Sequence, residues 1–246
     1  MELILLFGSC GLIGKEIFDS LVDKKYNVYG FDINKNFDSE RVYELDLTNF
    51  NSVDDLFQTN LESLKKYEKI HIIYLSAIDS KLDQVWEPLH EFSLKEWRKF
   101  STTNQEAMLY LISKFIHAKV NNIIKAELNF ILFPSLYNFI APDQQAYDDK
   151  MKVMKPFYYI GSKSLVRDLN RYINSSYAHI KVFSNCVVPH LVVQSDQKVN
   201  QNLLNKTLTK QRTDVRDIIK TTEFLINRPS NLVGQEIIVD GGWSIV

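Results

Sequence analysis

Two residues of one predicted helix have the right types and spacing for proton transfer. Tyr159 and Lys163 lie four positions apart in the segment YIGSK, and residues at i and i+4 share one face of a helix. A free tyrosine has a pKa of about 10 and is a weak base at neutral pH. A neighbouring ammonium favours the phenolate. The pair predicts a tyrosine that exchanges a proton with a substrate oxygen; the alternative is that Tyr158 and Tyr159 are core aromatics.

Two polar residues precede this helix. Ser135 follows the apolar segment 127–133, where its hydroxyl could bind a substrate carbonyl or hydroxyl group. Asn104 lies inside a long helical region, 93–120. Each has a plainer interpretation, as a loop serine and as a solvated side chain.

A turn containing three glycines follows the first apolar segment. The chain has eight glycines in 246 residues, fewer than the average usage of roughly 7%. Three of them stand in GSCGLIG, between the strand 3–7 and the helix 12–25. Backbone amides and the helix N-terminus at such a turn suit a pyrophosphate, although a purely structural turn is the alternative. We expect the nucleotide contacts here to be Gly8, Cys10, Gly11, Leu12, Ile13 and Gly14.

Acidic residues end the next two predicted strands. Asp32 stands 18 positions after Gly14, where a carboxylate accepts hydrogen bonds from the ribose hydroxyls of NAD and repels the 2′-phosphate of NADP. The sequence therefore favours NAD(H) over NADP(H). Asp46, followed by Leu47, could meet the adenine edge or cap the following helix, and both interpretations stay open.

The elements that must position these residues alternate along the chain. Apolar segments predict strands, amphipathic segments between them predict helices, and strands that are apolar throughout indicate a sheet covered on both faces. We expect one α/β domain over 1–246, with a doubly wound, mostly parallel, seven-stranded sheet whose carboxyl edge binds the ligand. The predicted strands are 3–7, 27–32, 41–45, 70–76, 127–133, 180–188 and 236–240; the helices are 12–25, 52–67, 93–120, 157–173 and 214–227.

The composition of the chain limits the classes of partner that it is expected to bind. Lys and Arg number 29 against 30 Asp and Glu, and the net charge of -1 predicts no attraction to nucleic acid or to an anionic membrane. Cys10 and Cys186 lack the spacing of a disulfide framework or a zinc site, and we expect no metal. The first apolar run is too short to span a bilayer. These features predict a soluble, cytoplasmic protein with a small-molecule substrate.

Taken together, the motifs resemble those of the short-chain dehydrogenase/reductase family, in its compact single-domain branch. The resemblance covers essentially the whole chain and implies a Rossmann-like fold. It rests on GSCGLIG, Asp32, the DLT segment, Asn104, Ser135, YIGSK, NCVVP and the terminal VDGGW at 239–243.

The resemblance implies an NAD(P)-dependent oxidoreductase that interconverts a secondary alcohol and a ketone. Tyr159 would be the general acid and base, and Lys163 would lower its pKa and hold the nicotinamide ribose. Ser135 would orient the reacting oxygen, and Asn104 would hold a water of a proton relay. Further cofactor contacts would come from Ser76, Ala77 and Pro189. A homodimer or homotetramer would form through the helices 93–120 and 157–173 and the tail.

The chain departs from the family pattern after the fourth predicted strand, after Pro189 and between Ser135 and Tyr159, as well as in its glycine spacing. Only Ala77 survives from the motif Asn-Asn-Ala-Gly. His190 replaces a glycine after Pro189 and is either a substrate contact or a solvent-facing histidine. The segment 136–158 is longer than usual and forms either a polar pocket wall, suited to a polar or carbohydrate-derived substrate, or a surface insertion. Its polar residues include Tyr137, Tyr147, Asp148 and Asp149.

These departures leave other functions open. One is an inactive protein of this fold that senses nucleotides or serves as a scaffold. Another is a sugar-nucleotide epimerase or dehydratase, suggested by the glycine spacing, although the longer C-terminal domain of such enzymes is missing. Gly30, in the second predicted strand, has no role that the sequence reveals.

Overall fold

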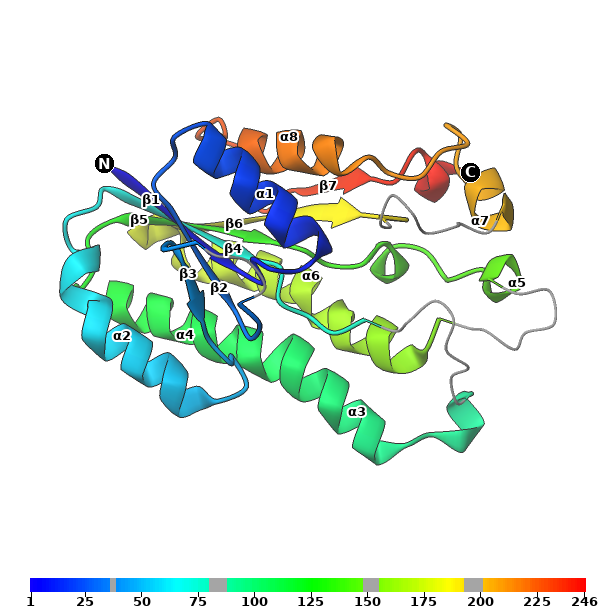
Figure 1. The fold of residues 1–246 in the computed structure, drawn as a ribbon, viewed down its shortest axis with the longest axis horizontal. Coiled ribbons are helices and arrows are strands. Elements are labelled where there is room, and N and C mark those ends of the chain that lie inside the picture. The colour runs from blue at the N-terminus through cyan, green and yellow to red at the C-terminus, as the bar shows by residue number, and fades with distance from the viewer. Residues whose placement is uncertain (36–38, 80–87, 148–154, 193–200) are drawn as a thin grey trace.

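The chain builds one parallel β-sheet with helices on both faces (Figure 1). The computed structural model describes residues 1–35, 39–79, 88–147, 155–192 and 201–246. The strand order is β3-β2-β1-β4-β5-β6-β7, and every neighbouring pair is parallel. This confirms the predicted sheet. The strands are β1 (Glu2–Phe7), β2 (Val28–Asp32), β3 (Val42–Glu44), β4 (Lys69–Tyr74), β5 (Glu127–Leu132), β6 (Val182–Pro189) and β7 (Glu236–Val239).

Helices cover the two faces of the sheet as separate layers (Figure 1). On one face lie α1 (Leu12–Asp23) and α8 (Val215–Ile226), and on the other lie α2 (Phe50–Leu64), α4 (Ala107–Val120) and α6 (Phe157–Tyr177). Three shorter helices are α3 (Leu94–Ser101), α5 (Gln144–Tyr147) and α7 (Gln201–Lys206). The strand order reverses between β1 and β4, which is where doubly wound sheets bind ligands.

The strand β1 shows why the sheet needs both layers. Leu3, Leu5 and Phe7 point into the core beneath α2 and α4, whereas Ile4 and Leu6 point into the core beneath α1 and α8. Successive strand residues face opposite sides, so an apolar run with no polar alternation is stable only between two helical layers.

Several predicted elements differ from the structure in their bounds, and two of these differences affect the candidate site. The strand predicted over 70–76 ends at Tyr74, because the amides of Leu75 and Ser76 both donate to the Phe7 carbonyl, at 2.8 and 3.1 Å, and turn the chain. The helix predicted over 93–120 is interrupted by a π-helical turn, Thr102–Glu106, which joins α3 to α4. Such turns are rare inside helices and often mark functional sites.

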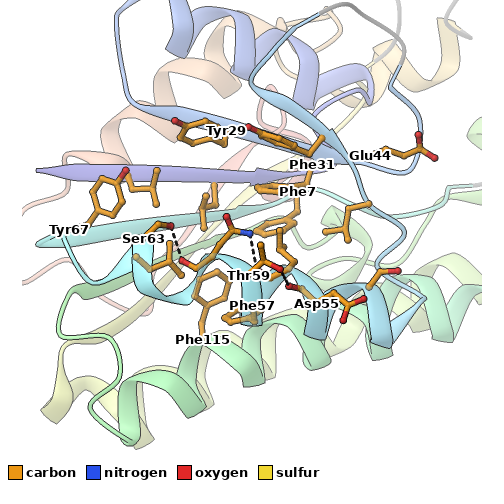
Figure 2. Close-up of a pocket in the computed structure, with 18 of the residues that line it drawn as sticks. Phe7, Tyr29, Phe31, Glu44, Asp55, Phe57, Thr59, Ser63, Tyr67 and Phe115 are labelled. Atoms are coloured by element: carbon orange, nitrogen blue, oxygen red, sulfur yellow. Dashed lines mark hydrogen bonds between the residues drawn. The ribbon is translucent and has the colours of Figure 1, made fainter.

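An apolar cavity of about 570 Å³ lies between α2 and the strands β1, β2 and β3 (Figure 2). The rings of Phe7, Phe31 and Tyr43 stack along its wall. Polar side chains of α2 bond back to their own helix there; Thr59 Oγ1, for example, donates to the Asp55 carbonyl at 2.7 Å. None of the predicted site residues lines this cavity. In the described ranges, no helix has the length and apolar character needed to cross a membrane.

Candidate active site

The glycine turn is held against two neighbouring strands. Gly8 has a φ of +88°, a conformation that side chains rarely adopt. The amides of Gly8 and Ser9 donate to the Phe31 carbonyl of β2 at 2.8 and 3.2 Å. A Cβ on Gly8 would lie 2.6 Å from the Ser76 amide nitrogen, beyond β4. The turn therefore sits in contact with the ends of β2 and β4.

Three glycines in and near this turn differ in what a side chain at their position would contact. A Cβ on Gly14 would lie 1.9 Å from the Gly8 carbonyl oxygen, so Gly14 lets α1 approach the turn. A Cβ on Gly30 would lie 2.6 Å from Ser9 Oγ, which explains the glycine that had no predicted role. Gly11 is exposed, and a Cβ there would meet the protein only at 3.5 Å. Protein packing does not require a glycine at Gly11, whereas close approach of a ligand to the backbone would.

Gly11 is also the N-cap residue of α1, and no side chain caps that helix. The first backbone amides of a helix have no partner within it. Together with the helix dipole they favour an anion. An uncapped helix behind an exposed glycine suits a pyrophosphate, and its binding at this turn remains a prediction.

Asp32 lies directly beside this turn. Its Oδ2 accepts from the Cys10 amide at 2.9 Å, and its Oδ1 accepts from the Asn34 amide at 3.1 Å. A carboxylate oxygen accepts more than one hydrogen bond, so both oxygens can still accept from ribose hydroxyls. The Cys10 amide donates to Asp32 and so fixes the carboxylate relative to the turn. The contact of Cys10 with the nucleotide remains a prediction.

Asp46 does not cap α2, and this corrects one of the two interpretations of that residue. The N-cap is Asn49, whose side chain accepts from the Ser52 amide at 3.4 Å. Asp46 Oδ1 accepts from the amide and hydroxyl of Thr48, at 2.8 and 2.7 Å. This bonding holds Asp46 at the carboxyl edge of the sheet, with Leu47 buried beside it. Its contact with adenine remains a prediction.

The segment after β4 joins the turn to the predicted catalytic residues. Ser76 is half-buried and Ala77 is exposed. One residue further, the Ile78 amide donates to Asn104 Oδ1 at 2.8 Å, and Asn104 Nδ2 donates to the Ile78 carbonyl at 3.0 Å. Asn104 thereby ties this segment to the π-helical turn.

Asn104 is buried and extends the link to α6. Its Nδ2 also donates to Ser162 Oγ at 2.9 Å, and that hydroxyl donates to the Tyr159 carbonyl at 2.9 Å. Both amide hydrogens of Asn104 thus serve protein partners. The structure shows a residue that positions Ile78 and α6. The predicted water of a proton relay remains a prediction.

Ser135 is placed by a capping box. Its hydroxyl accepts from the Tyr137 amide at 3.3 Å, and its own amide donates to Asn138 Oδ1 at 3.1 Å. Asn138 Nδ2 also donates to the Ile160 carbonyl at 3.2 Å. This asparagine therefore fixes the serine loop relative to α6, one residue beyond Tyr159. The sequence analysis missed it.

Tyr159 stands on the first turn of α6 beside Ser135. Burial raises the pKa of its phenol well above the usual range, and the Asp79 carboxylate raises it further. A hydrogen bond with the Ser135 hydroxyl acts in the opposite direction. In this form Tyr159 is a protonated phenol at neutral pH, and the predicted lowering of its pKa by Lys163 remains a prediction.

Lys163 follows Tyr159 by one helical turn, and both residues lie in α6. It is 8% exposed, and burial lowers the pKa of its ammonium to about 8. Among the residues described, it has no hydrogen-bond partner at its side chain. A buried amine without a protein partner is suited to bind a polar group of a ligand.

The long segment after Ser135 packs into the site where the structure describes it. Tyr137 is buried, and its hydroxyl shares a hydrogen bond with that of Tyr147. This favours the pocket wall over the surface insertion for these two residues. Asp148 and Asp149 lie outside the described residues.

His190, beyond Pro189 at the end of β6, is buried rather than solvent-facing. Its ring lies between those of Tyr137 and Trp243, at centroid distances of 5.4 and 4.3 Å. Burial lowers its pKa to about 4, so the imidazole is neutral at pH 7.

The sequence analysis also missed Lys155 and Asp79. Lys155 Nζ lies 4.0 Å from the centroid of the Tyr159 ring and 2.6 Å from Asp79 Oδ1. The signal in the sequence was the position of Lys155, four residues before Tyr159, just as Lys163 is four residues after it. In the described part of the chain, no group of three His, Cys, Asp or Glu side chains is placed to hold a metal.

No protein-family model matches the sequence, and no curated protein matches it. Solved structures do match the fold. A short-chain dehydrogenase from Leptospira borgpetersenii with bound NAD+ is 21% identical with a TM-score of 0.85, covering 99% of this chain and 93% of that chain. A 4-hydroxyisoleucine dehydrogenase complexed with NADH is 19% identical with a TM-score of 0.80, covering 99% and 98%.

A third structure, the ligand-free aldohexose dehydrogenase of Thermoplasma acidophilum, is 19% identical with a TM-score of 0.79, covering 100% of this chain and 94% of that chain. Identities this low establish a shared fold. The chain therefore has the Rossmann-like α/β fold of these dehydrogenases.

Proposed function

We propose that the chain is a nicotinamide-dependent oxidoreductase of the short-chain dehydrogenase/reductase type, which interconverts a secondary alcohol and a ketone. The observation that carries this is one continuous set of contacts along the carboxyl edge of the sheet. It runs from Gly8 to the segment after β4, then through Asn104 to α6. These contacts fix the glycine turn, which suits an anion, relative to Tyr159 and Ser135.

The residues present fit the cofactor. An exposed Gly11 and an uncapped α1 suit its pyrophosphate. The buried Lys163 ammonium, which has no hydrogen-bond partner within the described ranges, suits its ribose. Asp32 carries a negative charge where a 2′-phosphate would lie, which supports NAD(H) over NADP(H). NAD+ and NADH also stand in the names of two structures of this fold.

The nicotinamide ring supplies the hydride chemistry, and the protein supplies the proton transfer and the positioning. In the reductive direction the Tyr159 phenol would donate its proton to the ketone oxygen. In the oxidative direction the phenolate takes the hydroxyl proton. The Ser135 hydroxyl holds the reacting oxygen, and the Lys163 ammonium stabilises the phenolate.

Family resemblance supports a homodimer or homotetramer as part of the proposal. Among the residues described, exposed apolar side chains occur on the helical segments expected to supply the interface: Leu94, Leu109, Phe157 and Tyr172.

The test is to titrate the purified protein with NADH and NADPH by fluorescence, and then to screen secondary alcohols and ketones for a net change in NADH. We expect NADH to bind more tightly than NADPH and some alcohol to be oxidised. Cofactor binding without turnover across the panel would indicate the inactive nucleotide-sensing protein. Conversion of a sugar nucleotide without net NADH would indicate an epimerase.

A further inference from the structure

A second lysine stands beside the proposed catalytic tyrosine. The Lys155 side chain is 8% exposed, its ammonium is 2.6 Å from Asp79 Oδ1, and it lies over the Tyr159 ring. Burying a charge is costly unless it has partners. We therefore expect a buried lysine in contact with the reacting phenol to have a function in the site.

Its main chain is fixed as well as its side chain. The Lys155 amide donates to Gln144 Oε1 at 2.9 Å, and Gln144 Nε2 donates to the Lys155 carbonyl at 3.0 Å. The glutamine thus clamps both polar groups of one peptide residue. The ammonium is held in place by a local structure, as expected for a recognition group whose position matters.

The donors of this ammonium are not all used. A lysine has three N–H groups. Asp79 accepts from one, and the Tyr159 ring lies on another side. Within the described ranges no other acceptor contacts Nζ. Asp79 is the shallower partner, with its side chain 53% exposed, so the pair is reachable from outside.

The charge of Lys155 acts on a second buried polar group, the imidazole of His190. Among the residues that the structure describes, His190 Nε2 has no hydrogen-bond partner, although the residue is buried, at 8% exposed. The Lys155 charge contributes to the low pKa of His190, and the ring of His190 contacts that of Tyr137. A buried nitrogen of this kind is costly unless a ligand satisfies it. As a neutral imidazole in its Nε2–H tautomer it can donate to an anion.

We propose that Lys155 and His190 form a carboxylate-binding subsite, and that the substrate is a short hydroxy acid. The carboxylate accepts from the Lys155 ammonium and from His190 Nε2–H, while the hydroxyl group lies between Ser135 and Tyr159. One ammonium that already faces one acid suits a singly charged carboxylate group better than a doubly charged phosphate group. This inference rests on the proposed function, since the reacting hydroxyl is assigned to Tyr159.

The experiment measures carboxylate binding directly, by calorimetry, with and without NADH. The probe is succinate, which has no hydroxyl to oxidise, and the matched neutral probe is succinamide. We expect succinate to bind at least about tenfold more tightly than succinamide. Equal binding of the two, or no binding of succinate in either state, would overturn the subsite. Failure of NADH to bind would count against the proposed function alone.

Three variants locate the interaction. Lys155→Met should weaken succinate binding at least about tenfold, and Lys155→Arg should keep the preference for succinate. Lys206→Met removes another lysine–aspartate pair of the same length, Lys206 with Asp143 at 2.6 Å, in which the lysine is 45% exposed. This variant should leave succinate binding unchanged. Equal effects of Lys155→Met and Lys206→Met would refute the assignment.

Asp79→Asn should change succinate affinity in the opposite direction. This test remains valid even if the lysine variants fail to fold. Removal of the competing carboxylate should strengthen succinate binding, because the ammonium then faces one anion instead of two. Weaker binding in this variant would contradict the proposal. With 3-hydroxybutyrate as the alcohol, Lys155→Met should raise KM far more than it lowers kcat.

Discussion

The turn after β1 and the cluster after β5 are built in opposite ways. In the turn, backbone packs on backbone: Gly14 fits against the Gly8 carbonyl, and Gly8 fits against the segment after β4. In the cluster, long side chains from distant segments meet around Tyr159, with Lys155 on its ring and the Ser135 hydroxyl beside it. The turn needs glycines, because a side chain would not fit between its backbone contacts. The cluster needs particular side chains, because these carry its polar and charged groups.

This difference separates two tasks. Seven consecutive residues and one carboxylate supply the proposed binding surface for a nucleotide, and they present backbone amides whose direction is fixed by the fold. The cluster presents ionisable groups whose pKa values are shifted by burial, as active sites commonly do. Perturbing the turn should therefore change cofactor affinity, and perturbing the cluster should change chemistry.

The largest effect should come from the phenol. Tyr159→Phe keeps the ring beneath Lys155 and removes the group that exchanges the proton, so turnover should fall by about a thousandfold or more. Turnover is measured by NADH absorbance with the best alcohol from a substrate panel, and cofactor affinity by fluorescence. A variant that keeps its turnover, or loses cofactor affinity to the same extent, would remove the division between the two regions.

Two glycines of the turn should respond differently to alanine. In Gly14→Ala the new Cβ meets a backbone oxygen at 1.9 Å, so the free energy of unfolding should fall by about 3 kcal/mol. Urea unfolding followed by circular dichroism measures this.

The matched control is Gly11→Ala, whose Cβ has 3.5 Å of clearance. It should keep its stability and lose NADH affinity. Equal stability of the two variants would show that the backbone contact between α1 and the turn is unimportant.

The buried imidazole predicts a pH dependence of stability. Burial lowers the pKa of His190 from 6.5 to about 4. Between those values the unfolded chain binds a proton that the native protein does not, so stability falls as the pH falls from 6.5 towards 4. Lowering the pH across that window should reduce the free energy of unfolding of the wild type by on the order of 2 kcal/mol through His190.

His190→Gln lacks this titration and serves as the comparison. Urea unfolding at pH 7 and at pH 4.5 should show a smaller loss of stability for the variant than for the wild type. If both lose the same free energy, His190 does not titrate with a lowered pKa.

The smallest effect concerns cofactor choice. Asp32→Asn keeps an oxygen for the Cys10 amide and removes the charge that would repel a 2′-phosphate. We expect the ratio of NADPH to NADH affinity to rise by about tenfold, or about 1.4 kcal/mol. Fluorescence titration with both cofactors measures the ratio. An unchanged ratio would place the adenine ribose away from Asp32.

The sequence alone determined the sheet and the turn. Apolar strand segments separated by amphipathic helices force a parallel sheet between two layers, and the spacing of Gly8, Gly11 and Gly14 predicts the turn, because both depend on local pattern. The i and i+4 spacing also placed Tyr159 and Lys163 on one helix.

Only the tertiary structure decided what surrounds those residues. Asp79 and Gln144 bond to Lys155 from separate segments, and the Lys155 charge acts on His190, just after β6. Nothing local to any of these residues indicates that they come together. Burial decided the protonation states, because the pKa of Lys163 or His190 depends on how much water the folded chain excludes. A sequence pattern carries the period of a helix or strand, whereas desolvation and long-range charge arise only when distant segments pack.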